Sequence, residues 1–174
     1  NLASVFGELR VDGNGNFSSE ILLSPNNFAN SPRQITTADI DDDGDLDVLS
    51  ANASGGGITW WENINGVGNF EYHWIPFSIV FPFSVTTSDI DLDGDIDIIF
   101  PSMIDNMIGW YENQDGLGTF HTEEQFITQN AMGAVHVFAA DMDGDGVSDI
   151  LSASRYDNKI AWYANDGSGS FGAQ

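Results

Sequence analysis

The sequence predicts an all-β protein built from repeated four-stranded antiparallel sheets, and three observations support this fold class. An acidic loop occurs three times, and its copies begin 50 and 52 residues apart, at Asp39, Asp89 and Asp141. An apolar segment rich in β-forming residues follows each loop. Each repeat then carries an aromatic pair and a glycine-containing turn. A period of about 50 residues made of short β segments is typical of the blades of a β-propeller.

The acidic loop is the first element of each repeat. Its first copy runs from Asp39 to Asp47, and every copy has aspartate at positions 1, 3, 5 and 9 and glycine at position 6. Carboxylates this close repel one another strongly unless a cation lies between them. Ca²⁺ takes about 6 to 8 oxygen ligands, and the glycine permits a sharp turn around it. We therefore expect three calcium loops, in which position 7 (Asp45, Asp95 or Val147) contributes its backbone carbonyl.

An EF-hand begins with the same alternation of aspartates, but it requires a bidentate glutamate at position 12 and a helix on each side. Position 12 is Ser50, Phe100 or Ser152 here. The flanking segments 35–38 and 48–51 are rich in β-forming residues. The loop is therefore expected between two strands. The alternative is a solvated acidic turn without a metal, and the recurrence of the same ligand positions in three copies favours calcium.

The remaining elements of the first repeat follow in order. We expect strands near 34–38, 47–52, 58–63 and 70–75. Asn-Gly and Asp-Gly turns join the third and fourth strands, because both residues tolerate positive φ. The aromatic pairs on the third strands are Trp60-Trp61, Trp110-Tyr111 and Trp162-Tyr163. Neighbouring strand residues point to opposite faces, which predicts that both aromatics of a pair pack in the core. The alternative is that they form platforms for carbohydrate.

Comparison of the three repeats divides the chain into four segments. Residues 1–26 are expected to be the tail of a preceding blade, 27–76 and 77–128 to be complete blades, and 129–174 to be an incomplete one. The total is about three and a half blades, whereas closed propellers usually have about 4 to 8. Two copies would complete a seven-bladed ring as a homodimer. The alternative is that the sequence is an excerpt of a longer propeller.

The apolar connection 76–83 has two interpretations, a binding patch or a seam between blades, and the seam is slightly favoured. Strand order places the calcium loops and glycine turns on one rim of the ring. The opposite rim carries the connections that vary most between repeats, 52–57, 102–107 and 154–159.

The chain is strongly acidic, with 4 Lys and Arg against 27 Asp and Glu and a formal net charge of −23. This charge argues against nucleic acid or an anionic membrane as partner. Cysteine is absent, which excludes disulfides and thiolate metal sites. No leader and no apolar run of about 18 residues is visible, so we expect no membrane insertion. Without calcium, the chain should be weakly folded or unfolded near neutral pH.

The pattern Asp-x-Asp-x-Asp-Gly-x-x-Asp, followed by an apolar strand and a Trp-Tyr-Glu-Asn-type segment, resembles the FG-GAP/VCBS repeats of integrin α-subunit propellers and of many secreted proteins. The resemblance covers roughly residues 30–174. It implies a calcium-binding β-propeller in a secreted or cell-surface protein, usually an adhesion or recognition module. The implied calcium ligands are Asp39, Asp41, Asp43 and Asp47; Asp89, Asp91, Asp93 and Asp97; and Asp141, Asp143, Asp145 and Asp149.

Three functional classes are compatible with these features. The favoured class is a calcium-stabilised recognition or adhesion module that binds a protein or glycan through the rim opposite the calcium loops. The alternative is a carbohydrate-binding propeller lectin, or a non-catalytic module of a polysaccharide-active enzyme. The third is a propeller lyase, which would require a cluster of His, Tyr and basic residues. His73, His121 and His136 share no ligand spacing, so we expect no catalytic residues.

Overall fold

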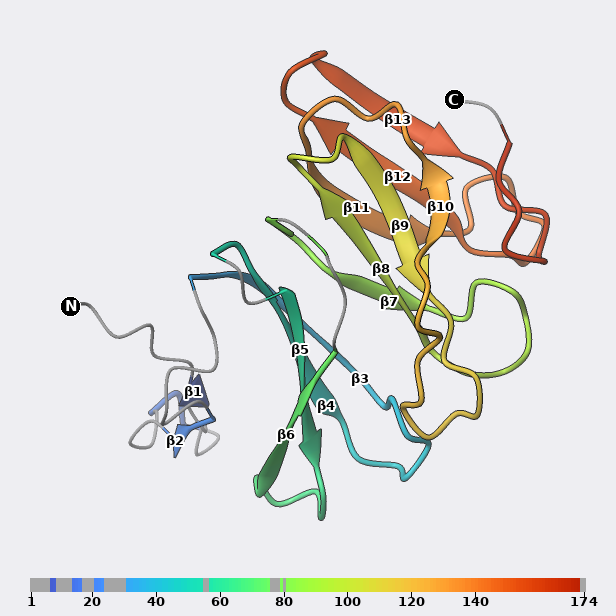
Figure 1. Ribbon diagram of the computed structural model, residues 1–174. Coiled ribbons are helices and arrows are strands. Elements are labelled where there is room, and N and C mark those ends of the chain that lie inside the picture. The colour runs from blue at the N-terminus through green and yellow to red at the C-terminus, as the bar shows by residue number, and fades with distance from the viewer. Residues whose placement is uncertain are drawn as a thin grey trace.

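The computed structural model of the chain describes residues 7–8, 14–16, 21–23, 31–54, 57–75, 79 and 81–172. All regular structure in these residues is β-strand, in three antiparallel sheets of three or four strands and one two-stranded sheet (Figure 1). The two-stranded sheet pairs β1 (Gly7–Glu8) with β2 (Ile21–Leu22). The predicted all-β fold class is confirmed. The described residues include no helix capable of crossing a membrane.

The first large sheet has its strands in sequence order. They are β3 (Pro32–Ala38), β4 (Asp47–Asn52), β5 (Gly57–Asn63) and β6 (Phe70–Trp74). These bounds differ from the expected ones by at most two residues, so the predicted strands are confirmed. Leu49 on β4 lies opposite Trp60 on β5, which in turn lies opposite His73 on β6. This row of paired residues defines one face of the sheet.

The other two sheets repeat the plan. The second contains β7 (Thr86–Ser88), β8 (Asp97–Ser102), β9 (Met107–Tyr111) and β10 (Gln125–Thr128). The third contains β11 (Ala134–Ala140), β12 (Asp149–Ser154) and β13 (Lys159–Tyr163). Within the described part of the chain, β13 pairs only with β12. The third sheet therefore has three strands where the other two have four.

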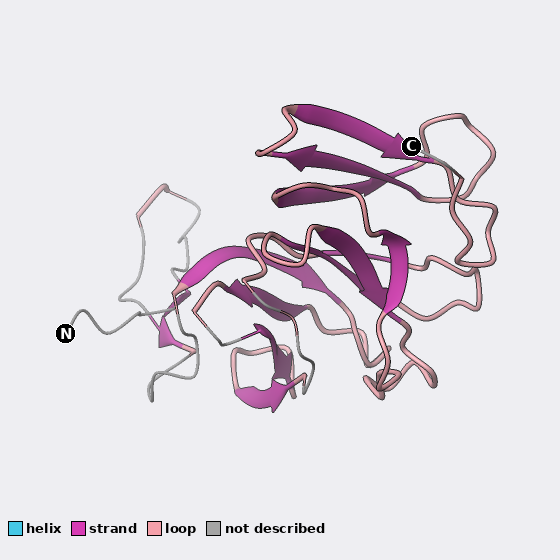
Figure 2. Cartoon of the chain, turned by 45° about the horizontal axis from the view of Figure 1, so that its top comes forward, coloured by secondary structure: helices cyan, strands magenta, loops and turns pink. Residues whose placement is uncertain are grey.

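The sheets lie one after another like successive blades of a propeller, and they do not close into a ring (Figures 1 and 2). One apolar core fills the space between the first and second sheets, with Leu49 and Trp60 facing Phe100 and Tyr111. A second core lies between the second and third sheets. All six residues of β8 are buried, because a sheet covers each of its faces. This inner strand of the middle blade is thus buried on both faces, with apolar residues at its centre.

The aromatic pairs test the predicted packing of the third strands. Trp60, Trp61, Trp110, Tyr111 and Tyr163 are all buried, as predicted. The prediction is wrong for Trp162, which remains 44% exposed. Trp162 lies opposite Leu151 as Trp110 lies opposite Ile99, so its position in the sheet is equivalent. The difference arises because no described sheet covers that face of the third blade.

The apolar connection between the first two blades is only partly described, since residues 76–78 and 80 lie outside the described set. Ile75 and Ile79 are buried in the core between the first and second sheets. Arg33 lies over the ring of Phe83, 5.1 Å from its centroid. Ile79 of this connection therefore helps to fill a seam between blades, whereas Phe81 is exposed.

Candidate metal centres

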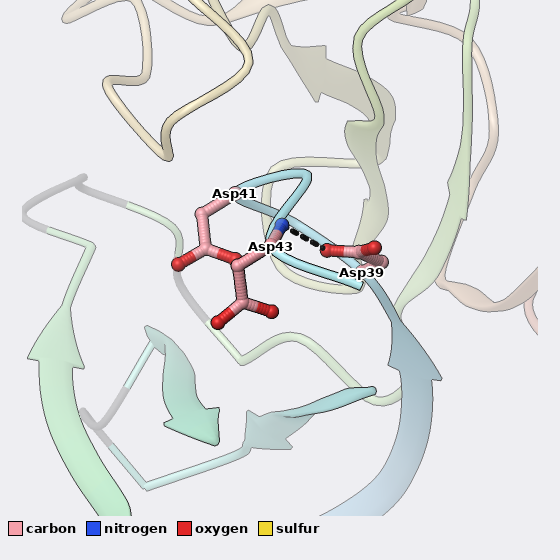
Figure 3. A group of neighbouring side chains, drawn as sticks. All are labelled: Asp39, Asp41 and Asp43. Atoms are coloured by element: carbon pink, nitrogen blue, oxygen red, sulfur yellow. Dashed lines mark hydrogen bonds between the residues drawn. The ribbon is translucent and has the colours of Figure 1, made fainter. Parts of the chain in front are cut away.

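Each acidic loop joins the first two strands of its sheet, and its own side chains shape the turn. In the first loop, Asp39 accepts hydrogen bonds from the backbone N–H groups of Asp43 (3.1 Å) and Gly44 (3.0 Å). Gly44 has φ of 92°, a conformation that costs glycine little. Figure 3 shows the carboxylates of Asp39, Asp41 and Asp43 gathered around this turn. Local hydrogen bonding by aspartate thus brings alternate carboxylates together.

The structure groups ten of the twelve carboxylates predicted at positions 1, 3, 5 and 9. Within each group, one oxygen per residue lies within 4.8 Å of the others. The groups are Asp39, Asp41 and Asp43; Asp89, Asp91 and Asp97; Asp91, Asp93 and Glu112; and Asp141, Asp143 and Asp149. Asp47 and Asp145 lie outside them. Asp145 instead accepts a hydrogen bond from Val147 N at 2.8 Å.

The aspartate at position 9 was expected only as a calcium ligand, but it also has a structural role. Asp47, Asp97 and Asp149 are completely buried. Asp97 accepts from Ile90 N (2.8 Å) with one oxygen and from Asn113 N (2.9 Å) with the other. Equivalent pairs of bonds hold the other two copies. This carboxylate therefore ties the acidic loop to the hairpin turn, which confirms that both lie on one rim.

The side chain at position 7 lies outside the carboxylate groups and contacts the glycine turn. The carboxylate of Asp45 lies so close to Gly66 of the glycine turn that a Cβ on this glycine would overlap it. Asp95 has the same relation to Gly116. Val147 is buried at the equivalent place. A backbone carbonyl ligand at this position stays a prediction.

Burial and mutual repulsion raise the pKa values of several loop carboxyls. Burial is the main cause for Asp97, whose pKa rises to about 7. For Asp91, burial acts first and the charge of Asp93 second, with a further contribution from Glu112. Charged carboxylates in these loops are therefore costly without a counter-charge.

The donor set fits a hard cation. All the grouped ligand atoms are carboxylate oxygens, which suit Ca²⁺ better than a softer metal. Among the described residues, one buried oxygen each of Asp41, Asp89 and Asp91 has no hydrogen-bond partner. Buried carboxylate oxygens are rarely left in this state, so these atoms have free capacity for a cation.

Two further features join neighbouring blades at the loop rim. Asn113 in the second blade donates from its side chain to Ile40 O in the first loop (2.9 Å), and Asn165 donates to Ile90 O in the second loop (2.7 Å). Gly118 lies so close to Trp60 of the preceding blade that a Cβ there would overlap the indole ring. Gly169 has the same relation to Trp110.

The sequence model of the FG-GAP-like repeat matches residues 39–100 and 89–152. These matches include the three acidic loops and span more than half of the chain. The chain belongs to the FG-GAP-like repeat family. No relative was found among curated proteins.

A solved structure shares the fold. It is described as the structural basis of specific recognition of non-reducing terminal N-acetylglucosamine by a lectin of Agrocybe aegerita. The similarity has a TM-score of 0.63 at 20% sequence identity, and it covers 96% of this chain and 45% of the lectin chain. This chain therefore spans less than half of the length of that lectin.

Within the FG-GAP-like repeat, the sequence analysis noted the Trp-Tyr-Glu-Asn-type segment but assigned no role to its glutamate and asparagine. Glu112 joins a carboxylate group, and Glu62 raises the pKa of Asp41, although burial, Asp47 and Asp43 have larger effects. The third repeat has Ala164 at this position. The recurrence of Glu-Asn in two repeats was the available signal.

Proposed function

We propose that this chain is a calcium-stabilised, extracellular recognition module of the FG-GAP-like family, and that its partner is a carbohydrate. The observation that carries the proposal is the position of the acidic groups. Asp47, Asp97 and Asp149 are buried and use both carboxylate oxygens to hold backbone N–H groups. Such groups maintain blade geometry, which favours a binding role over a catalytic one.

Calcium would stabilise the loops by neutralising their carboxylates. The support is the all-oxygen donor set and the unpartnered oxygens of Asp41, Asp89 and Asp91. Extracellular calcium modules bind the ion at about 10⁻⁴–10⁻³ M, so an extracellular location predicts an affinity in this range for the three loops. Asp41, Asp91 and Asp143 would serve as position 3 ligands of the three sites.

A carbohydrate partner is favoured over a protein partner by the fold shared with the Agrocybe aegerita lectin. A protein adhesion partner is the second candidate, favoured by the resemblance to integrin repeats. Both would use the surface left free by the loops, such as the rim that carries the connections 52–57, 102–107 and 154–159.

Calcium titration by calorimetry tests the first half of the proposal. We expect uptake of three Ca²⁺, one fewer in Asp91→Ala, and an unchanged number in Glu123→Gln, which removes an exposed carboxylate outside the loops. Calcium should also raise the thermal midpoint, and Mg²⁺ should do so less. A chain that takes up no calcium at millimolar concentration would contradict the calcium proposal.

A glycan array in calcium buffer tests the second half. We expect binding to at least one glycan class and loss of this binding in a chelator. A folded, calcium-loaded chain that binds no glycan would overturn the carbohydrate partner and leave the protein partner as the remaining candidate.

A further inference from the structure

We infer that two copies of this chain associate head to tail, and that Trp162 of one copy enters an apolar hollow on the first blade of the other. The inference goes beyond the proposed function and does not depend on carbohydrate binding. The hollow has a volume of about 250 Å³. It is lined by Leu46, Val48, Gly68 and Phe70 of the first blade and by Leu23, among others.

Inside the chain, an indole fills the equivalent place at both seams between the large sheets. Gly118 of the second blade lies so close to Trp60 of the first that a Cβ on this glycine would overlap the ring. Gly169 of the third blade has the same relation to Trp110 of the second. Each glycine turn thus forms one wall of a socket that receives the indole of the preceding blade.

The first blade has the same socket, and its hollow shows that the socket is open. The residues that line it lie 50 positions before residues packed around Trp60 in the second blade. Leu46 is 61% exposed, whereas Ile96 at the equivalent position packs against the core that contains Trp60. No tryptophan precedes Trp60 in the sequence, so the segment before the first blade supplies no indole. The matched residues are Leu46 and Ile96, Val48 and Ile98, Gly68 and Gly118, and Phe70 and Phe120.

The inner strand of the first blade is uncovered on the same face. Ile35 on β3 is 52% exposed. Val85 and Val137 occupy the equivalent positions, four residues before the acidic loops, and lie buried in the cores between blades. A preceding blade covers this position in the second and third sheets, and no described segment covers it in the first.

The third blade, at the other end of the row of sheets, exposes the indole that would fill such a socket (Figure 1). Trp162 holds the strand position of Trp60 and Trp110, opposite Leu151 on β12. It is 44% exposed, whereas Trp60 is 4% exposed. One end of the chain therefore presents an indole and the other end an open socket. Contacts between unlike surfaces of two copies are heterologous, and this pair of surfaces repeats the two seams already present within the chain.

A hydrogen bond between inner strands gives the same alignment of the two copies. Ser84 Oγ of the second blade accepts from Val137 N of the third at 3.1 Å, and Gln34 Oε1 accepts from Val85 N in the same way. His136 is the next residue in this series. Head-to-tail packing would therefore place His136 of one copy beside Ile35 of the other. Both residues are exposed in the single chain.

Sedimentation velocity of the full chain in calcium, over a range of concentrations, tests the association. We expect the parent chain to self-associate. Trp162→Ala removes the indole and Leu46→Ser removes a wall of the socket, so each should weaken association about tenfold or more. Phe126→Ala is the matched control, because it removes a 47% exposed aromatic from an outer strand of the second blade. It should leave association unchanged.

Disulfide trapping tests which surfaces meet, and the absence of cysteine from the chain makes single substitutions unambiguous. We expect a mixture of His136→Cys and Ile35→Cys chains, oxidised in calcium, to form a disulfide-linked dimer. Neither variant alone should form it efficiently, since a disulfide requires Cα atoms within about 4.4–6.8 Å. A mixture of Ile35→Cys and Ile104→Cys is the control, because Ile104 is exposed outside the strands.

The outcomes are separate from those of the proposed function. A parent chain that stays monomeric in calcium, or Trp162→Ala chains that associate as strongly as the parent, would overturn the inference. Preferential linkage of two His136→Cys chains to each other would overturn the head-to-tail arrangement. Calcium uptake and glycan binding are measured independently and stand in each case. The substituted residues are exposed, and unchanged calcium uptake checks that the variants remain folded.

Discussion

Asp149 illustrates how one buried carboxylate can organise a whole loop. Its two oxygens accept hydrogen bonds from Met142 N at 3.0 Å and Asn165 N at 2.9 Å. Substitution of Asp149 by Asn places an NH₂ group against one of these N–H donors. We expect a loss of about 1–3 kcal/mol in the free energy of unfolding. Urea unfolding in a chelating buffer at about pH 5 measures this loss of stability without the contribution of bound metal.

Asp143→Asn is the matched control, since Asp143 is an exposed carboxylate of the same loop. Its effect under the same conditions should lie within about 0.5 kcal/mol of zero. Equal losses in the two variants would mean that position 9 has no special structural role.

The pKa of Asp97 gives the metal-free chain an unusual pH dependence. Burial raises this pKa from 3.8 in the unfolded chain to about 7 in the folded one. Between these values the folded chain holds more protons than the unfolded chain, so stability falls as pH rises from about 4 to 7. Burial raises the pKa values of Asp47, Asp41 and Asp91 in the same direction.

Urea midpoints in a chelator across this pH range measure the effect. Calcium should stabilise the chain more at neutral than at acid pH, because protons compete for the same oxygens. A metal-free chain whose stability climbs steadily towards neutrality would be inconsistent with the raised pKa values.

The part of the candidate metal centres that depends on local spacing of aspartates was predictable from the sequence. Alternate aspartates at positions 1, 3 and 5 must approach one another in a tight turn, and the structure groups them in the first loop. The two hydrogen bonds of Asp97 could not be predicted in this way. One of them joins Asp97 to Asn113, 16 residues away, across a hairpin whose exact register the sequence does not specify.

At the level of elements, the glycine turn acts as a spacer between blades. Gly118 has φ of 80°, and a Cβ on it would overlap Trp60. Gly118→Ala should therefore cost about 2–4 kcal/mol, the sum of backbone strain and overpacking. Gly15 aligns with it in sequence, has φ of 86°, and among the described residues no atom lies within 4 Å of a Cβ built on it. Gly15→Ala should cost only the strain, about 1–2 kcal/mol.

Thermal and urea unfolding of the two variants in calcium check this difference. Comparable losses would indicate that the close approach of Gly118 to the indole does not matter.

The strands themselves were predictable because apolar alternation sets their register and glycine turns set their ends, as in β4 and β5. The asparagine contacts between blades were not, since Asn113 and Ile40 lie 73 residues apart in the chain.

At the level of the whole molecule, the third blade exposes a surface that its neighbours bury. Phe138, Leu151 and Trp162 lie in one row across it, equivalent to the row of Trp110 in the second blade. Trp110 is 1% exposed, whereas Trp162 is 44% exposed and Ile160 is 79% exposed. An apolar face of this kind marks an interface. A further blade of the same repeat would cover it as the third blade covers the second.

A second copy of the chain could cover this face of the third blade, because two copies would complete a seven-bladed ring. The similar lectin is a little more than twice as long as this chain. We expect a calcium-dependent dimer in solution, measured by light scattering after size exclusion. Ile160→Asp should return the monomer, because burial of a charge at the seam is costly. Ile104→Asp alters an exposed isoleucine outside the strands and should leave the dimer intact. A strict monomer of the parent chain in calcium would rule out self-association as the way this face is covered.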